Sequence, residues 1–203
     1  METIWTPHRF SGEVLALDVA NTVVLRDDPD RRFDRFEQAD EIVRFARAAT
    51  AFRAEEIGGN TLVVSDPSGA KPRMVALRET TDALFRDASV SGAIRSERLA
   101  PLLDQCARAL EAAPVMFAAG QAGLRAGQGT IELEAAVAVS ALSLLAPEMQ
   151  RRIRICGNCG WLFLDRSRNG SRVWCDMTVC GNRQKARRHY RRRRDDEGRT
   201  VDA

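Results

Sequence analysis

Apolar residues recur at helical spacing through most of the first 150 residues. The segment 13–25 is almost wholly apolar after its first residue, and its polar residues Asp18, Asn21 and Thr22 stand at i, i+3 and i+4. Residues at this spacing share one face of a helix. The pattern therefore predicts a buried helix that carries a small polar stripe.

Four later segments also have the apolar periodicity of helices, and they are residues 37–52, 73–89, 96 to just before Pro114, and 133–146. Ser96 suits an N-cap, and the last segment is hydrophobic nearly all round, which is typical of a helix central to a core. Short apolar runs at 62–64, 115–117 and 130–133 predict minor strands, since glycines separate the last two. We therefore expect a mainly helical α+β fold here.

The formal net charge of +3 conceals a strong internal asymmetry. Residues 1–150 carry 16 Lys and Arg against 22 Asp and Glu, whereas residues 151–194 carry 14 against 2. Such a split suggests that the C-terminal segment meets a polyanion. We therefore divide the chain into a regulatory domain at 1–150, a basic module at 151–194 and an acidic tail at 195–203, which we expect to be disordered.

Two features exclude other classes of protein. The longest apolar stretch, residues 135–146, has 12 residues including two serines and falls short of the ~20 that a membrane span needs. The N-terminus has no basic stretch ahead of an apolar run, so we expect no secretory signal and a cytoplasmic location, where disulfides are rare.

Four of the five cysteines lie in the basic module, in the pattern Cys156-x2-Cys159-x15-Cys175-x4-Cys180. Two cysteine pairs at this separation are typical of a tetrahedral zinc site. We expect one structural Zn²⁺ per chain, since four thiolates leave no coordination position for a catalytic water. An iron–sulfur cluster and a redox-active disulfide pair are the alternatives for the same four residues.

The residues between the two cysteine pairs predict a β-hairpin. Apolar runs at 161–165 and 171–174 would be its strands, and Asn169-Gly170 would be its turn. The resulting order of knuckle, hairpin and helix is that of a treble-clef zinc finger.

From about Thr178 to Arg194 the chain predicts a strongly basic helix, with Arg183, Arg187 and Arg191 at i, i+4 and i+8. Like charges at this spacing each cost an isolated helix about 0.2–0.5 kcal/mol, so we expect an anion to offset them. Nucleic-acid phosphate suits arginine, and a solvated charged face is the alternative. The predicted nucleic-acid-binding residues are Arg168, Arg172, Arg183, Lys185, Arg187, Arg188, His189, Arg191, Arg192 and Arg194.

Candidate chemistry in the first 150 residues is sparse. Asp18 lies in an apolar segment, so its carboxyl group must be hydrogen-bonded, paired or protonated. It either bridges neighbouring backbone or forms a ligand pocket with Asn21 and Thr22, and a catalytic role is the third alternative. Cys106 falls on an apolar stripe, which favours an inert core thiol over a nucleophile. No group of residues suggests catalysis, so we do not expect an enzyme.

The sequence resembles a known family at both ends. Cys156-x2-Cys159-Gly-Trp-Leu-Phe-x-Asp and Cys180-Gly-Asn-Arg-x-Lys-Ala-Arg-Arg are similar to the CGNR-type zinc finger of bacterial stress-induced transcription regulators. Leu15-x-Leu17-Asp18-x2-Asn21-Thr22 resembles the opening of the ABATE domain that precedes this finger in the family. The resemblance implies four cysteine zinc ligands, a DNA-binding face from Arg183 onward and an ABATE domain that senses a ligand or partner.

We therefore predict a DNA-binding transcription regulator, in which a zinc finger docks an arginine-rich helix on DNA under control of the N-terminal domain. Its partners would be DNA and an unidentified small-molecule or protein effector. The alternative is a small-molecule- or protein-binding sensor whose zinc finger is a platform for RNA or for another protein.

Overall fold

The computed structural model describes residues 2–113, 117–120, 123–126 and 129–199. The α-helices are α1 (Leu15–Ala20), α2 (Ala39–Phe52), α3 (Pro67–Ser91), α4 (Ser96–Ala112), α5 (Leu133–Ser143), α6 (Pro147–Gln150) and α7 (Asn182–Arg199), with a 3-10 turn η1 (Pro7–Phe10) and a π-helical turn η2 (Met177–Gly181). The strands are β1 (Val23–Val24), β2 (Phe33–Asp34), β3 (Thr61–Val63), β4 (Phe117–Gly120), β5 (Gly123–Ala126), β6 (Thr130–Glu132), β7 (Ile153–Ile155) and β8 (Leu162–Leu164).

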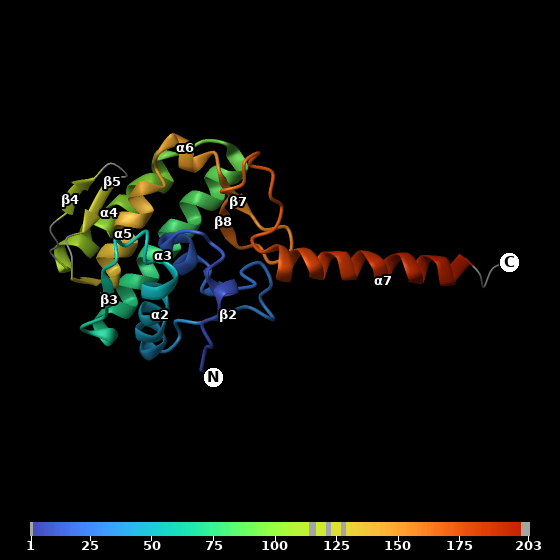
Figure 1. The fold of residues 1–203 in the computed structure, drawn as a ribbon, viewed down its shortest axis with the longest axis horizontal. Coiled ribbons are helices and arrows are strands. Elements are labelled where there is room, and N and C mark those ends of the chain that lie inside the picture. The colour runs from blue at the N-terminus through green and yellow to red at the C-terminus, as the bar shows by residue number, and fades with distance from the viewer. Residues whose placement is uncertain (1, 114–116, 121–122, 127–128, 200–203) are drawn as a thin grey trace.

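The strands pair into small two-stranded sheets between the helices (Figure 1). β1–β2, β4–β5 and β7–β8 are antiparallel, whereas β3–β6 is parallel with Leu62 opposite Ile131. The mixed fold of helices and minor strands expected from the sequence is therefore confirmed. Of the predicted strand at 115–117, residues 115 and 116 lie outside the described residues.

Helix α1 lies in the core, with α3 and α5 packed against it. Every residue of this helix is buried, as its apolar sequence predicts. The predicted helix over 13–25 was too long at both ends. Glu13 has φ +71°, a left-handed conformation that a helix cannot include, and after Asn21 the chain turns into β1. Asn21 and Thr22 therefore lie just beyond the helix.

The other predicted helices differ from the observed ones at their ends. α3 begins at Pro67, earlier than the predicted residue 73, because the carboxylate of Asp66 accepts a hydrogen bond from Gly69 N (3.0 Å) and caps the first turn. Ser96 is the first residue of α4, so the N-cap residue is Arg95. α5 ends at Ser143, and the following proline starts the separate turn α6.

One hydrophobic core crosses the predicted domain boundary near residue 150. Ile153, Leu162 and Leu164 of the β7–β8 hairpin belong to the same buried cluster as Leu17 of α1. A smaller cluster joins the cysteines to Trp161 and Phe163. The hairpin therefore packs against the helical body with some of its residues and against the cysteines with others. The division into domains stays a prediction.

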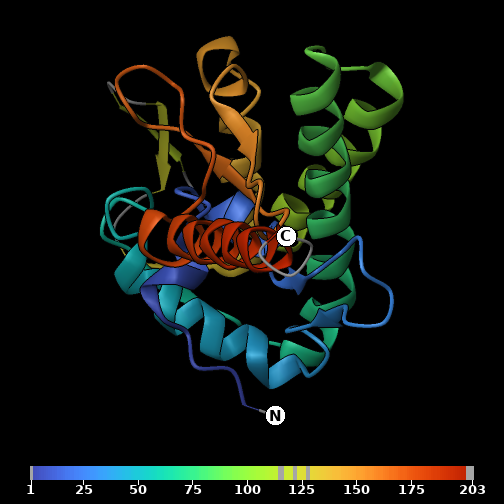
Figure 2. The same cartoon turned by 90° about the vertical axis from the view of Figure 1, so that its right-hand side faces the viewer.

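Helix α7 projects away from the rest of the chain (Figures 1 and 2). It continues to Arg199, so residues 195–199 are helical in the structure and not part of a disordered tail, whereas residues 200–203 lie outside the described residues. Among the helices that the structure describes, none is long and apolar enough to span a bilayer.

Candidate functional site

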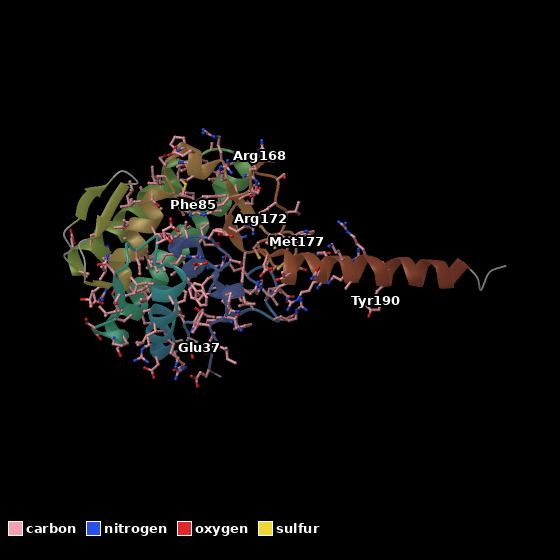
Figure 3. The ribbon with its side chains drawn as sticks, viewed as in Figure 1. Glu37, Phe85, Arg168, Arg172, Met177 and Tyr190 are labelled. Atoms are coloured by element: carbon pink, nitrogen blue, oxygen red, sulfur yellow. The ribbon has the colours of Figure 1, made fainter. Side chains whose placement is uncertain are left out.

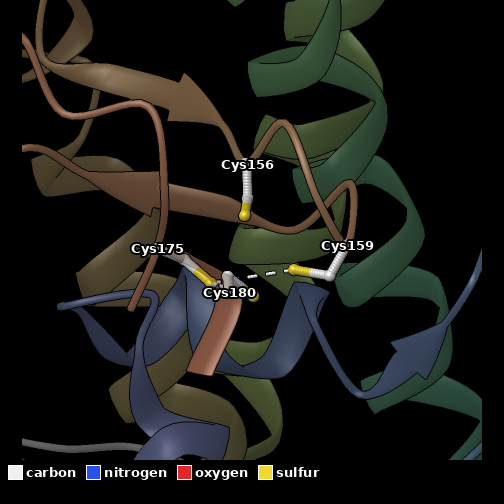
Figure 4. A group of neighbouring side chains, drawn as sticks. All are labelled: Cys156, Cys159, Cys175 and Cys180. Atoms are coloured by element: carbon white, nitrogen blue, oxygen red, sulfur yellow. Dashed lines mark hydrogen bonds between the residues drawn. The ribbon is translucent and has the colours of Figure 1, made fainter. Parts of the chain in front are cut away.

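Four cysteines meet at one end of the β7–β8 hairpin (Figure 4). Cys156 and Cys159 come from the turn between the strands, where Cys156 N donates to Trp161 O (2.8 Å) and Gly160 N donates to Cys156 O (2.9 Å). Gly160 has φ +72°, a conformation in which other residues are strained, so glycine closes this turn. The C-x-x-C spacing thus forms the tight knuckle that the sequence predicts.

The four sulfur atoms are placed as a tetrahedral metal site requires. All lie within 4.8 Å of one another, with Cys175 Sγ 3.7 Å from Cys159 Sγ and 3.6 Å from Cys180 Sγ. A zinc ion with Zn–S bonds of about 2.3 Å needs sulfurs roughly 3.8 Å apart. The cysteines fit one structural zinc ion, as predicted.

The predicted hairpin between the two cysteine pairs was wrong. β8 pairs with β7, which precedes the knuckle, and the segment 171–174 forms no strand. The reason is the buried carboxylate of Asp165, which accepts hydrogen bonds from Ser167 N (2.9 Å) and Arg172 N (2.8 Å). Burial alone would raise the pKa of Asp165, but these hydrogen bonds outweigh it and lower the pKa. The loop therefore wraps around a carboxylate instead of forming a ladder.

The root of α7 is held from several sides. Asp176 Oδ1 accepts hydrogen bonds from Thr178 N (2.7 Å) and Val179 N (3.1 Å), so it caps the turn η2 that carries Cys180 into α7. Asp176 Oδ2 lies 3.0 Å from His8 Nδ1. A Cβ on Gly181 would lie 2.6 Å from the Met177 sulfur, so a larger residue here would displace the exposed Met177 side chain. Zinc, cap and packing together fix where α7 leaves the body.

The predicted basic residues of α7 are displayed to solvent. Arg183, Lys185, Arg187, Arg188 and Arg191 are all exposed. Tyr190 lies part-way along the same helix, outside the body, and is 66 % exposed (Figure 3). The sequence had offered packing against Trp161 or Trp174 as one alternative for this residue, and its exposure does not favour that alternative. The side chains of His189, Arg192 and Arg194 lie outside the described residues.

The two predicted arginines outside α7 are placed differently. Arg172 is half-buried, with Nη1 on Glu13 Oε1 (3.1 Å), Nη2 on Cys175 O (2.5 Å) and its guanidinium 5.2 Å from the centre of the Phe163 ring. The structure therefore gives Arg172 internal partners and not an open nucleic-acid face. Arg168 is exposed but lies on the loop after β8, set apart from α7 (Figure 3).

Asn21 joins α1 to the zinc-binding hairpin. Its side-chain amide bridges both backbone groups of Leu162, accepting from Leu162 N (3.0 Å) and donating to Leu162 O (2.8 Å). Next to it, Leu164 N donates to Gly12 O (3.0 Å). These bonds occupy the edge of β8 that β7 leaves free, in the manner of a third strand. The polar stripe thus docks the hairpin on α1.

Asp18 and Thr22 have protein partners as well. Asp18 Oδ1 accepts from Gly12 N (2.9 Å) and Oδ2 accepts from Arg53 Nε (2.6 Å). Burial raises the pKa of Asp18 to about 7, although Arg53 opposes the shift. The Thr22 hydroxyl donates to Val19 O and accepts from Arg78. All three side chains of the stripe are buried, and this geometry favours the structural alternative over the ligand pocket.

A small cavity of about 200 Å³ lies beside the knuckle, lined in part by Cys159, Trp161, Arg26 and Arg86. It does not include the predicted pocket residues, and it is smaller than the roughly 300 Å³ of ordinary ligand sites. The thiol of Cys106 is buried in the helical body. Burial raises its pKa to about 11, in agreement with the prediction of an inert core thiol.

Sequence reasoning missed His8 and Arg35 as neighbours of the zinc-binding module. His8 stacks on Trp161 with ring centres 5.4 Å apart, and Arg35 lies 5.3 Å from the same ring. Both are more than 120 positions from Trp161, so no local spacing could have revealed these contacts.

Comparison with protein families matches residues 152–193 to the CGNR zinc finger. The match contains all four cysteines and the exposed basic residues of α7. Comparison of the whole chain with curated proteins finds no match.

Proposed function

We propose that the protein is a DNA-binding transcription regulator, in which a zinc-anchored finger presents α7 to the phosphate backbone. The observation that carries this proposal is the pairing of two features in one module. Residues 152–193 match the CGNR zinc finger, and the helix that follows the fourth cysteine exposes Arg183, Lys185, Arg187, Arg188 and Arg191.

Charge and shape support a polyanionic partner. α7 stands clear of the acidic body, so a long ligand can approach it without meeting the negative residues of 1–150 (Figure 1). An α-helix also has the width that the major groove of B-DNA admits, whereas the major groove of an RNA duplex is deep and narrow. The same features favour duplex DNA over duplex RNA.

The role of zinc in this proposal is structural. Four protein sulfurs fill its coordination positions, so the ion supplies folding free energy to the module and no catalytic water. The finger is of treble-clef type in that a knuckle and a helix start supply the ligands. We propose that it works in the cytoplasm and without enzymatic activity.

The N-terminal part would be an ABATE domain that responds to an effector. Its opening motif supports this, because Asn21 of that motif binds Leu162 of the zinc-binding hairpin. Asp18 acts one step removed, since it accepts a hydrogen bond from Gly12 N, and Gly12 O accepts from Leu164 N of the hairpin. An event that disturbs α1 would therefore reach the finger directly. The effector would be a small molecule or another protein.

The test is the salt dependence of DNA affinity, measured by fluorescence anisotropy on the zinc-loaded chain. If the five described basic residues each neutralise one phosphate, log affinity falls with log salt at a slope of about −4.5. The triple variant Arg187→Ala, Arg188→Ala, Arg191→Ala should lose about 2.7 of that slope. The control triple variant is Arg47→Ala, Arg98→Ala, Arg108→Ala, which removes the same charge from exposed positions of the body. It should keep the salt slope of the parent protein.

Two results would reject the proposal. One is an affinity that does not depend on salt, and the other is equal binding by the α7 variant and its control. Tighter binding to duplex RNA of the same sequence would instead favour the alternative of an RNA platform.

A further inference from the structure

Arg35 is a buried cation at the junction between the body and the finger. Its side chain is 8 % exposed and its guanidinium lies 5.3 Å from the ring centre of Trp161 and 5.4 Å from that of Phe33. Nη1 donates to Asn21 O at 3.3 Å, and Nε is buried without a hydrogen-bond partner. Trp161 Nε1 beside it is a second buried donor without a partner. Two donors are thus available in one place.

Arg35 differs from the other buried arginine, Arg78, in having no counter-charge. Arg78 forms a bidentate pair with Asp34, at 2.6 and 2.7 Å. In the part of the chain that the structure describes, no carboxylate pairs with Arg35. Burial, together with the nearby cation Arg9, lowers the pKa of Arg35 to about 9. Since buried charges in proteins are ordinarily paired, two adjacent arginines here lack an anion.

Arg9 is free to share that anion. It is half-buried, and its Nε donates to Ile4 O at 2.6 Å. Among the described residues it too pairs with no carboxylate. Two arginines of this kind offer the forked donors that bind the oxygens of a phosphate.

The pair lies at the root of α7. His8, next to Arg9 in the chain, stacks on Trp161 and contacts Asp176, which caps the turn into α7. A strand of nucleic acid that follows α7 toward the body would therefore bring a phosphate to this position.

We propose that Arg35 and Arg9 form a binding site for a phosphate oxyanion at the root of α7. This proposal rests on the proposed function, and in it the anion is a phosphodiester of the nucleic acid that α7 contacts. A free phosphate ion has the same chemistry and is the other source. Either way, the acidic N-terminal part contributes a basic contact of its own.

The experiment compares the variants Arg35→Gln and Arg9→Gln with the control Arg98→Gln, which removes the same charge from an exposed position on α4. Each variant must retain about one zinc per chain and the circular dichroism of the parent protein. Arg9→Gln alters a half-buried side chain and keeps the test open if Arg35→Gln does not fold. Two readouts are taken: the salt slope for duplex DNA, and the shift of Tm on adding inorganic phosphate at constant ionic strength.

A phosphodiester site predicts that each Gln variant lowers the salt slope by about 0.9 while the control leaves it unchanged. A free-phosphate site predicts an unchanged slope and a rise of Tm with phosphate that Arg35→Gln abolishes. If neither readout responds to Arg35→Gln or Arg9→Gln, the site does not exist. If no variant and no parent protein binds DNA, the proposed function fails, and the phosphate readout alone still decides whether the site exists.

Discussion

Helices α1 and α7 are stabilised in opposite ways. α1 has six residues, all buried, and is too short to be stable alone, so packing against α3 and α5 makes it helical. α7 has 18 residues but projects from the body, and its like charges oppose helix formation. Its support comes from its root, where zinc and the cap residue Asp176 hold the turn that leads into the helix. A helix anchored at its root and projecting from the body can present its length to a partner.

The β7–β8 hairpin connects these two regions. One of its edges is bound by Asn21 and Gly12 of the body, and its turn supplies Cys156 and Cys159 to the metal. The position of α7 therefore depends on contacts made by residues near the N-terminus. The predictions below weaken one region at a time, starting where the effect should be largest.

Removing a zinc ligand should have the largest effect. Structural zinc contributes on the order of 10 kcal/mol to folding of such modules, so Cys180→Ser should lower Tm by roughly 20–40 °C and abolish zinc retention. Cys106→Ala is the matched control, since this buried cysteine lies outside the metal site. Elemental analysis and calorimetry measure both variants. Zinc retained by Cys180→Ser, or lost by Cys106→Ala, would contradict the assignment of the ligands.

Cutting the link between α1 and the hairpin should have an intermediate effect. Asn21→Ala leaves the buried N–H and C=O of Leu162 without partners, which should lower the free energy of unfolding by about 2–4 kcal/mol. Asn169→Ala changes an exposed asparagine of the neighbouring loop and should cost less than about 0.5 kcal/mol. Urea unfolding gives both values. Equal costs for the two variants would show that Asn21 does not dock the hairpin.

The pH dependence of Asp18 should be the smallest effect. Its folded-state pKa of about 7 lies above the ordinary value, so the folded chain holds this proton more tightly than the unfolded chain. Stability from this group is therefore complete in acid and is lost as pH rises through 7. The cost of Asp18→Asn, measured by urea unfolding, should shrink between pH 5 and pH 8. A cost that grows over this interval would mean that Arg53 keeps Asp18 ionised.

The sequence was sufficient for features that depend on local spacing. The C-x-x-C turn, the periodic helices and the exposed arginines of α7 all follow from residues within a few turns of one another. The four zinc ligands were predictable for the same reason, because cysteine spacing reflects the geometry of the metal.

Features that depend on distant partners were not predictable. The hairpin was assigned to the wrong strands because the partner of β8 lies before the knuckle, at 153–155, while the buried carboxylate of Asp165 binds the backbone of the loop that follows β8. The sequence predicted that Arg172 binds nucleic acid, but in the structure its guanidinium binds Glu13, which lies 159 positions away in the sequence. The pairing of His8 with Asp176 likewise spans 168 positions.

The most direct test of the account is amide hydrogen exchange of the zinc-loaded chain, with and without duplex DNA. Without DNA, α7 should exchange quickly beyond its root while α1 stays protected, because only α1 is packed. With DNA, we predict new protection along residues 183–194 and no change in α1. Protection that appears in the helical body but not in α7 would contradict the claim that this helix binds the nucleic acid.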